Sequence, residues 1–252
     1  MVKENRQIAS NTNVSLFITC IVDSFFPRVG ESMVKVLRRA GVQNITFPEN
    51  QTCCGQPAFN SGYPDEAREV AIKFLEDFDD DRYIVSPSGS CVSMVSVFYK
   101  QLFENDEQYL RLSEKISGKI YEFSDFLINV LGISNVGAKY SGKVAYHDSC
   151  HALRELGISN QPRELLRNVS GLKLIEMDMH DACCGFGGTF SVKLPNVSTA
   201  MLQEKVQCII DSGADTVVST DMGCLMNIEG YMSRKSIPIK VHHISEILSI
   251  TD

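Results

Sequence analysis

The chain has 252 residues, enough for one large domain or two small ones whose core needs no disulfide support. Apolar residues make up 44%, charged residues 22%, and the formal net charge is −7. This composition excludes a disordered chain and argues against a protein that binds nucleic acid by neutralising phosphates. No stretch reaches the roughly 20 apolar residues of a membrane span.

The N-terminal segment, residues 1–13, is polar and lacks the apolar core of a signal peptide. We therefore expect a flexible tail over 1–13 and a cytoplasmic protein. In a reducing cytoplasm, clustered cysteines are more often metal ligands or redox-active thiols than disulfide partners.

In the first half of the chain, short β-rich apolar runs alternate with segments of helical periodicity. The expected strands cover 14–19, 44–48 and 83–86. The expected helices cover 28–40 and 65–78, where apolar side chains recur every three or four residues. Residues 104–135 look mostly helical and contain no cysteine, so we expect them to connect two domains.

The second half follows the same order. The expected strands cover 143–147, 172–177, 216–219 and 238–242, and the expected helices cover 162–169 and 197–212. Strands that alternate with helices favour α/β units with mainly parallel sheets. The sequence therefore predicts two duplicated α/β domains, over 14–135 and 136–252.

Eight of the nine cysteines are laid out twice. The second set follows the first by 130 residues at three positions and by 133 at the fourth, and each vicinal pair is followed by glycine. The first set is Cys20, Cys53, Cys54 and Cys91; the second is Cys150, Cys183, Cys184 and Cys224. The ninth, Cys208, lies in the apolar pattern of a helix and is expected to pack there as a small hydrophobic residue.

Every repeated cysteine follows an expected strand and usually precedes a helix. The carboxyl ends of parallel strands line one crevice, so three loops of each half should bring four thiols together. Nearby helix N-termini favour the thiolate, and the adjacent glycines allow backbone N–H groups to approach sulfur.

Four thiolates suit either a tetrahedral zinc ion or a [4Fe–4S] cluster. Both sulfurs of a vicinal pair turn toward one mononuclear ion only with difficulty, whereas they readily bind different irons of a cluster. We therefore favour an iron–sulfur cluster and keep zinc as the alternative. A thiol–disulfide protein that uses the vicinal pairs, and a zinc-stabilised assembly scaffold, also stay open.

Several long motifs surround these cysteines: FPENQTCCGQPAFNSGY at 47–63, SPSGSC at 86–91, DACCGFGGTFSVK at 181–193 and DMGCLMNI at 221–228. The doubled pattern resembles the cysteine-rich CCG domain found in heterodisulfide reductases and in the iron–sulfur component of glycolate oxidase. It is most similar to the lactate utilization protein A family, and the resemblance covers the chain from Val14 onward.

The resemblance implies two Rossmann-like CCG domains in an oxidoreductase subunit that acts only with partners. Its implied role is electron transfer in a cytoplasmic complex that oxidises L-lactate to pyruvate, with lactate utilization proteins B and C. One or two iron–sulfur clusters would be bound by the eight repeated cysteines. Met94 and Asn227 stand where the broader pattern has a fifth cysteine, so each half suits a conventional [4Fe–4S] cluster and electron relay better than heterodisulfide chemistry.

Polar residues also flank Cys150. We expect His147 to be a strand-end histidine bonded to backbone and His151 to be exposed, although either could bind a metal or a cluster sulfur. Asp148 and Asp221 are expected to be local turn or cap residues. Arg154 is the nearest candidate for binding an anionic substrate.

Overall fold

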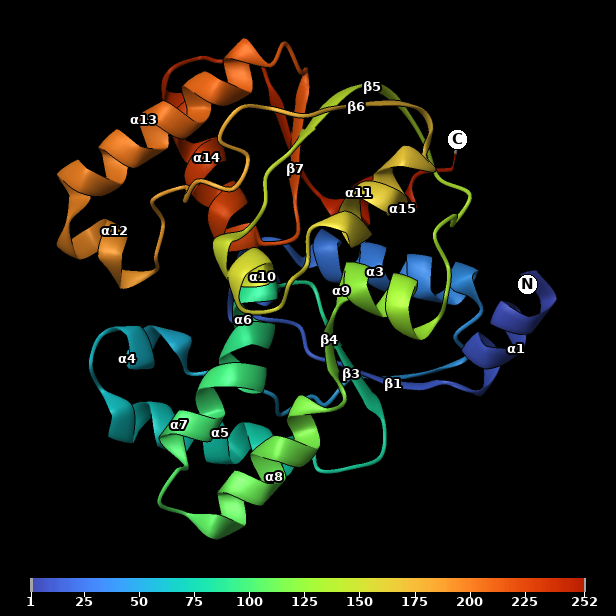
Figure 1. Ribbon diagram of the computed structural model, residues 1–252, viewed down its shortest axis with the longest axis vertical. Coiled ribbons are helices and arrows are strands. Elements are labelled where there is room, and N and C mark those ends of the chain that lie inside the picture. Colours follow the sequence, from blue (N-terminus) through green and yellow to red (C-terminus); the bar gives the residue numbers. More distant parts are fainter. Residues whose placement is uncertain (1, 252) are drawn as a thin grey trace.

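The computed structural model describes residues 2–251 and contains two α/β halves, each built on a four-stranded parallel sheet (Figure 1). The first sheet has the order β2-β1-β3-β4, and its strands are β1 (Asn13–Leu16), β2 (Asn44–Thr46), β3 (Tyr83–Ser86) and β4 (Ile120–Glu122). The second has the order β6-β5-β7-β8, and its strands are β5 (Lys139–Tyr146), β6 (Ser170–Ile175), β7 (Thr216–Ser219) and β8 (Lys240–His243). All strand pairs in both sheets are parallel, so the predicted duplicated α/β fold is confirmed.

Apart from α1, which precedes β1, helices follow the strands of both halves, and the first half has additional helices between β3 and β4. The first half has α1 (Val2–Asn11), α2 (Cys20–Phe25), α3 (Pro27–Ala40), α4 (Gln56–Asn60), α5 (Pro64–Asp77), α6 (Gly89–Ser93), the π-helix η1 (Met94–Phe98), α7 (Tyr99–Leu102), α8 (Glu107–Ser117), α9 (Phe123–Asp125) and the π-helix η2 (Phe126–Val130). The second half has α10 (Cys150–Arg154), α11 (Asn160–Arg167), α12 (Thr189–Lys193), α13 (Pro195–Asp211), α14 (Met222–Arg234) and α15 (Ile244–Ser249).

The strand register shows that the two halves repeat each other in structure as well as in sequence. Just past β1, the Phe17 N–H donates to the Val85 carbonyl at 3.0 Å. Just past β5, the His147 N–H donates to the Val218 carbonyl at 2.8 Å. Phe17 and His147 therefore occupy equivalent positions, immediately before the loops that carry the first cysteine of each set.

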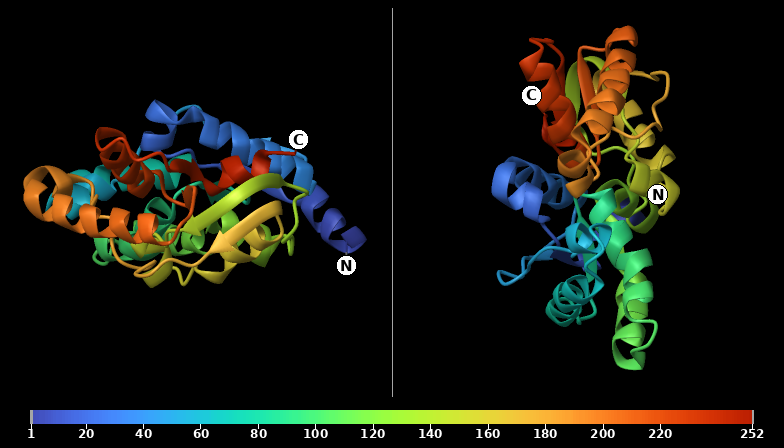
Figure 2. Two further views of the ribbon diagram at one scale, coloured as in Figure 1. Left: turned by 90° about the horizontal axis from the view of Figure 1, so that it is seen from above. Right: turned by 90° about the vertical axis from the view of Figure 1, so that its left-hand side faces the viewer.

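The two halves share one hydrophobic core. Helix α3 of the first half packs against α15 of the second, and the two lobes meet along these helices (Figures 1 and 2). Buried residues from both halves, Leu37 and Ile244 among them, belong to the same cluster. The Ser245 hydroxyl also donates to the Val29 carbonyl at 3.0 Å across this contact. The halves are thus fixed relative to each other by apolar burial that neither half completes alone.

The structure differs from the sequence expectations at two segments. Within the expected tail 1–13, residues 2–11 form α1, and Ala9 is fully buried in the shared core. Within the expected helical connector 104–135, β4 interrupts the helices and pairs with β3. Strand β4 has only three residues, too few for a periodic signal, and its place in the sheet matches that of β8. Every helix of residues 2–251 falls short of the length and hydrophobicity that a membrane span requires.

The carboxyl of Glu122, at the N-terminus of α9, is fully buried, and burial raises its pKa to about 8. The folded protein therefore holds a proton that the unfolded chain releases near pH 4.5. Between these pH values stability falls as pH rises, by about 1.4 kcal/mol per pH unit. Glu122→Gln should remove this slope in urea unfolding measured at several pH values from about 5 to 8. The exposed Glu107→Gln on α8 is the control and should keep it; equal slopes in all three proteins would contradict the prediction.

Candidate metal centre

One cavity of about 190 Å³ lies between the two halves, and all eight repeated cysteines line it. They are Cys20, Cys53, Cys54, Cys91, Cys150, Cys183, Cys184 and Cys224. Each half contributes four thiols from loops and helix starts that follow the carboxyl ends of three of its parallel strands. Cys208 is absent from the lining residues of this cavity. The structure therefore brings the two sets together at one place, which the repeat alone did not predict.

The geometry within each set is close. The Cys20 and Cys53 sulfurs lie 3.8 Å apart. The Gly55 N–H donates to the Cys53 sulfur at 3.4 Å, and the Gly185 N–H donates to the Cys183 sulfur at 3.3 Å. The first cysteine of each vicinal pair thus receives the same backbone hydrogen bond in both halves, as expected for sulfur ligands of a metal group.

The same contacts lower the pKa of one thiol in each set and raise the pKa of its neighbour. Hydrogen bonds from Cys20, then Cys54, and the Gly55 N–H lower the pKa of Cys53 to about 3. In the second set, bonds from Cys150, then Cys184, and from Gly185 lower the pKa of Cys183 to about 2. The pKa of Cys20 and that of Cys150 are raised, because each thiol donates to its neighbour and is partly buried. Each set therefore holds a ready thiolate, the form that binds metals.

Glycine is required at both turns after the vicinal pairs. Gly55 and Gly185 have φ of 81° and 79°, in the left-handed region. A Cβ on Gly185 would lie 2.6 Å from the Ser198 carbonyl oxygen. The loops are held from the other side by Tyr99, whose hydroxyl donates to the Cys54 carbonyl at 2.9 Å, and by Asn227, whose amide donates to the Cys184 carbonyl at 3.0 Å. Asn227, at the position of the missing fifth cysteine, therefore positions the loop.

Asp221 joins the helices that carry the last cysteine of each set. It caps its own helix α14 by accepting from the Gly223 N–H at 3.0 Å, so the cap expected from the sequence is confirmed. It also accepts from the Ser90 N–H at 2.9 Å and from the Ser88 hydroxyl at 3.2 Å, both in the other half. One carboxylate thus serves the N-termini of two helices, which suits its negative charge.

Asp148 is not a cap, so that expectation was wrong. Its side chain is fully buried and forms a bidentate ion pair with Arg163 of α11, at 2.7 and 2.8 Å. Arg163 also donates to Glu176 at 2.9 Å, and His180 Nδ1 lies 2.7 Å from Asp148. This network ties the end of β5 to the loop that leads to the second vicinal pair. Sequence reasoning missed it because Arg163 is 15 residues away and its helical position gives no sign of burial.

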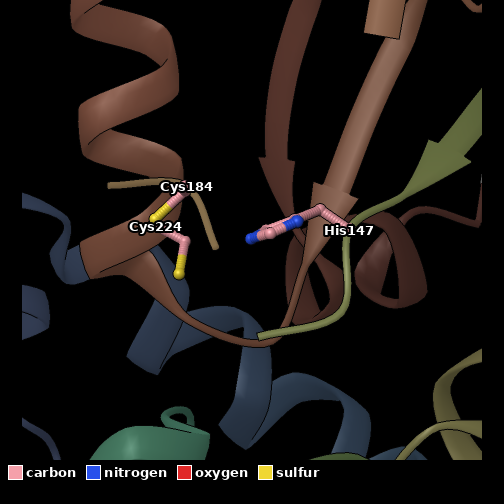
Figure 3. Close-up of side chains that lie close together, drawn as sticks. All are labelled: His147, Cys184 and Cys224. Carbon is pink, nitrogen blue, oxygen red and sulfur yellow. The ribbon is translucent and has the colours of Figure 1, made fainter. Parts of the chain in front are cut away.

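His147 is the clearest departure from expectation. The ring points toward the sulfurs of Cys184 and Cys224, and its nearest nitrogen and these sulfurs lie within 4.8 Å of one another (Figure 3). The residue is fully buried, and neither ring nitrogen has a hydrogen-bond partner of acceptable geometry within residues 2–251. The backbone of His180 lies close enough to oppose the fall in the pKa of His147, but it forms no hydrogen bond of standard geometry with the ring, so the expected backbone bond is not formed. Burial, followed by the charge of Lys205, lowers the pKa of His147 to about 4, so the neutral imidazole is the form present near pH 7.

Lys205 is a buried cation behind the second set, only 1% exposed, and it donates to the Met179 carbonyl. It is near enough to His147 to depress the histidine pKa. Sequence reasoning did not single it out. The available signal was its position on the apolar face of the 197–212 helix, three residues after Leu202 and four before Ile209.

The polar groups of the cavity are mostly uncharged, with Gln56, Asn60 and Ser90 among them, and Asp221 adds a negative charge. None of the described residues that line it is Lys or Arg, and Arg154 is not among them. His151 lines the cavity, is partly buried and contacts Glu155 at 3.3 Å. The cavity thus offers sulfur ligands in abundance and no permanent cation for a carboxylate substrate.

The donor chemistry fits a metal group. Each set supplies four thiols in one cavity, a backbone N–H to sulfur and a loop that only glycine permits, and the second set adds an unpartnered imidazole. Four thiolates match the ligand count of a [4Fe–4S] cluster or a structural zinc ion.

Comparisons with known proteins agree with this organisation. The CCG cysteine-rich domain matches residues 14–96 and 144–229. Lactate utilization protein A of Bacillus subtilis (strain 168) is 46% identical, over 94% of this chain and 98% of that protein. Lactate utilization protein A 1 of Bacillus anthracis (strain CDC 684 / NRRL 3495) is 44% identical, over 94% of this chain and 97% of that protein.

A solved structure of a hypothetical protein from Helicobacter pylori has a TM-score of 0.63 with this chain at 11% identity, covering 94% of this chain and 48% of that one. At that identity the likeness bears on the fold alone. The assignment to a family rests on the sequence relatives and on the two matches to the CCG domain. The chain belongs to the lactate utilization protein A family and contains two CCG cysteine-rich domains.

Proposed function

We propose that this protein is the iron–sulfur electron-transfer subunit of a complex that oxidises L-lactate to pyruvate. Each cysteine set would hold one cluster, and the [4Fe–4S] type suits four thiolates. The observation that carries the proposal is the convergence of all eight repeated cysteines in one cavity between the halves. The names of the relatives, lactate utilization protein A, support the process in which the protein acts.

The chain's own residues would position and tune the clusters. The cysteines supply the ligands, and the Gly55 and Gly185 N–H groups donate to ligand sulfur. Tyr99 and Asn227 hold the two loops in place. When bound, an iron–sulfur cluster supplies one-electron redox chemistry, and the protein sets its potential through burial and hydrogen bonds.

The lining of the cavity favours electron relay over oxidation of lactate at this site. A lactate carboxylate would be expected to pair with Arg or Lys, and none of the described lining residues is either. We therefore assign the chemistry on the substrate carbon to a partner protein of the complex. The family resemblance implies lactate utilization proteins B and C as those partners. Free thiols at every cysteine are consistent with a reducing, cytoplasmic setting.

The first test is iron and sulfide analysis, with a visible absorption spectrum, on protein purified and reconstituted without oxygen. We expect about eight iron and eight sulfide per chain, or about four of each if a single set is loaded. Cys183→Ser should remove the second set's share, and Cys53→Ser the first set's. Cys208→Ser is the matched control, because this cysteine is outside the cavity, and it should leave metal content and spectrum unchanged.

Two outcomes would overturn the proposal. Stoichiometric zinc without sulfide, with unfolding on chelation, would indicate a structural scaffold. Absence of metal after reconstitution, together with reversible loss of two thiols per vicinal pair on oxidation, would indicate a thiol–disulfide protein.

A further inference from the structure

The two cysteine sets have the same number of thiols but different surroundings. His147 stands beside the second set, and the matching backbone hydrogen bonds to Val85 and Val218 place Phe17 at the equivalent position in the first half. Phe17 belongs to the same buried cluster as Cys54 and Cys91 of its own set, and His147 lies beside Cys184 and Cys224 of the other.

A second position differs in the same way. The space beside Gly55 is bounded by Ala67 and Val70 of α5, and the space beside Gly185 by Ser198 and Met201 of α13. Ser198 follows Ala67 by 131 residues, and Met201 follows Val70 by the same number. The same offset makes Phe74 the counterpart of Lys205. Phe74 and Lys205 are both 1% exposed, so each faces the interior of its half.

In the first half, Phe17 and Phe74 belong to a buried cluster of aromatic side chains. The rings of Phe17 and Phe74 meet edge to face with centroids 4.8 Å apart, and Phe78 stacks on Phe74 at 4.6 Å. No polar atom of these side chains needs a partner. The first set is therefore backed by hydrocarbon at the two positions where the second half has His147 and Lys205.

In the second half the equivalent pair is an imidazole and an ammonium. The two ring nitrogens of His147 are buried without hydrogen-bond partners of acceptable geometry among residues 2–251. An unpaired buried polar group is costly, and a bond from one ring nitrogen to a metal would remove that cost. The ring nitrogen lies within 4.8 Å of both the Cys184 and the Cys224 sulfur, a spacing suited to donors around one metal.

We infer that His147 coordinates, through one ring nitrogen, an iron of the group bound by the second cysteine set, an inference that rests on the proposed function. The first set is then all-thiolate, and the second combines thiolates with a neutral imidazole. A [4Fe–4S] cluster takes one protein ligand per iron, so His147 would occupy the place of one of the four thiolates. Imidazole in place of thiolate raises the reduction potential of an iron–sulfur centre, as it does in Rieske centres. The buried Lys205 ammonium acts in the same direction by stabilising added negative charge. The second set therefore has the higher potential.

The test is pulsed electron paramagnetic resonance of the reduced, reconstituted full-length protein, prepared with natural or ¹⁵N-labelled histidine. We expect a strong nitrogen coupling that changes with the isotope, is lost in His147→Phe and is retained in His151→Gln. His147→Phe copies the first half. In a redox titration it should shift the higher of two potentials downward and leave the lower one unchanged.

The wild-type isotope comparison keeps the test valid even if His147→Phe fails to fold. A loaded paramagnetic cluster without histidine coupling, or coupling that disappears only in His151→Gln, would overturn the inference and leave the electron-relay proposal standing. Failure of the wild-type protein to bind iron and sulfide would overturn both. The two failures are thus distinguished by the iron content of the same sample.

Discussion

Replacing Arg163 by methionine is expected to lower the free energy of unfolding by about 3 kcal/mol, because its removal leaves the buried Asp148 carboxylate with only the partly exposed His180 ring as a partner. The Asp148 side chain is 0% exposed, and its two oxygens are both bound by the Arg163 guanidinium. Methionine fills similar space but cannot donate to the carboxylate. Denaturant unfolding of the metal-free protein measures the difference.

The matched control is Arg167→Met on the same helix. The Arg167 side chain is 60% exposed and reaches Glu176 only at 3.9 Å, so its loss should change stability by less than about 0.5 kcal/mol. Adding Asp148→Asn to Arg163→Met removes the stranded charge and should recover part of the lost stability. Equal stability of the Arg163 and Arg167 variants would show that the buried pair is energetically neutral.

Gly185→Ala is expected to abolish metal binding by the second cysteine set. The added Cβ would sit 2.6 Å from the Ser198 carbonyl oxygen, a backbone atom that cannot move without shifting α13. The left-handed φ of 79° adds about 1 kcal/mol of strain for alanine. The loop must therefore move, and with it the Cys183 and Cys184 sulfurs and the N–H that donates to Cys183.

Gly213→Ala separates the clash from backbone strain. Gly213 has φ of 67°, and nothing lies within 4 Å of a Cβ built there. This variant should lose a little stability and keep its full iron content after anaerobic reconstitution, whereas Gly185→Ala should lose the iron that Cys183→Ser loses. Normal iron content in Gly185→Ala would show that the loop tolerates a displacement of its backbone.

The fold was predictable to the extent that its signals were local. Runs such as 83–86 and 216–219 are apolar, β-rich and bounded by turns, and they form β3 and β7. β4 was missed because three residues carry no periodicity, and α1 because its polar sequence hid the burial of Ala9. In both cases pairing or packing with distant residues decides the local structure.

The candidate site was likewise predictable only where its signals were local. The cysteine repeat identified all eight thiols, because the spacing of residues can be read from the sequence without knowledge of the fold. Their meeting in one cavity depends on how α3 packs on α15, which no local pattern encodes. The environments of His147 and Lys205 likewise depend on which strand end and helix face converge, so sequence reasoning misjudged the first and overlooked the second.

Ser88 and Asp221 precede equivalent helices of the two halves, yet they contact each other, through an antiparallel bridge and a hydrogen bond of 3.2 Å. Contact between equivalent residues places them at the axis that relates the two halves, and self-contact across a two-fold axis is the mark of an isologous dimer. The two halves are therefore arranged like the subunits of such a dimer joined in one polypeptide. Joining them freed each copy to diverge, so that a feature needed on one side of the axis, such as His147, no longer has to appear on the other.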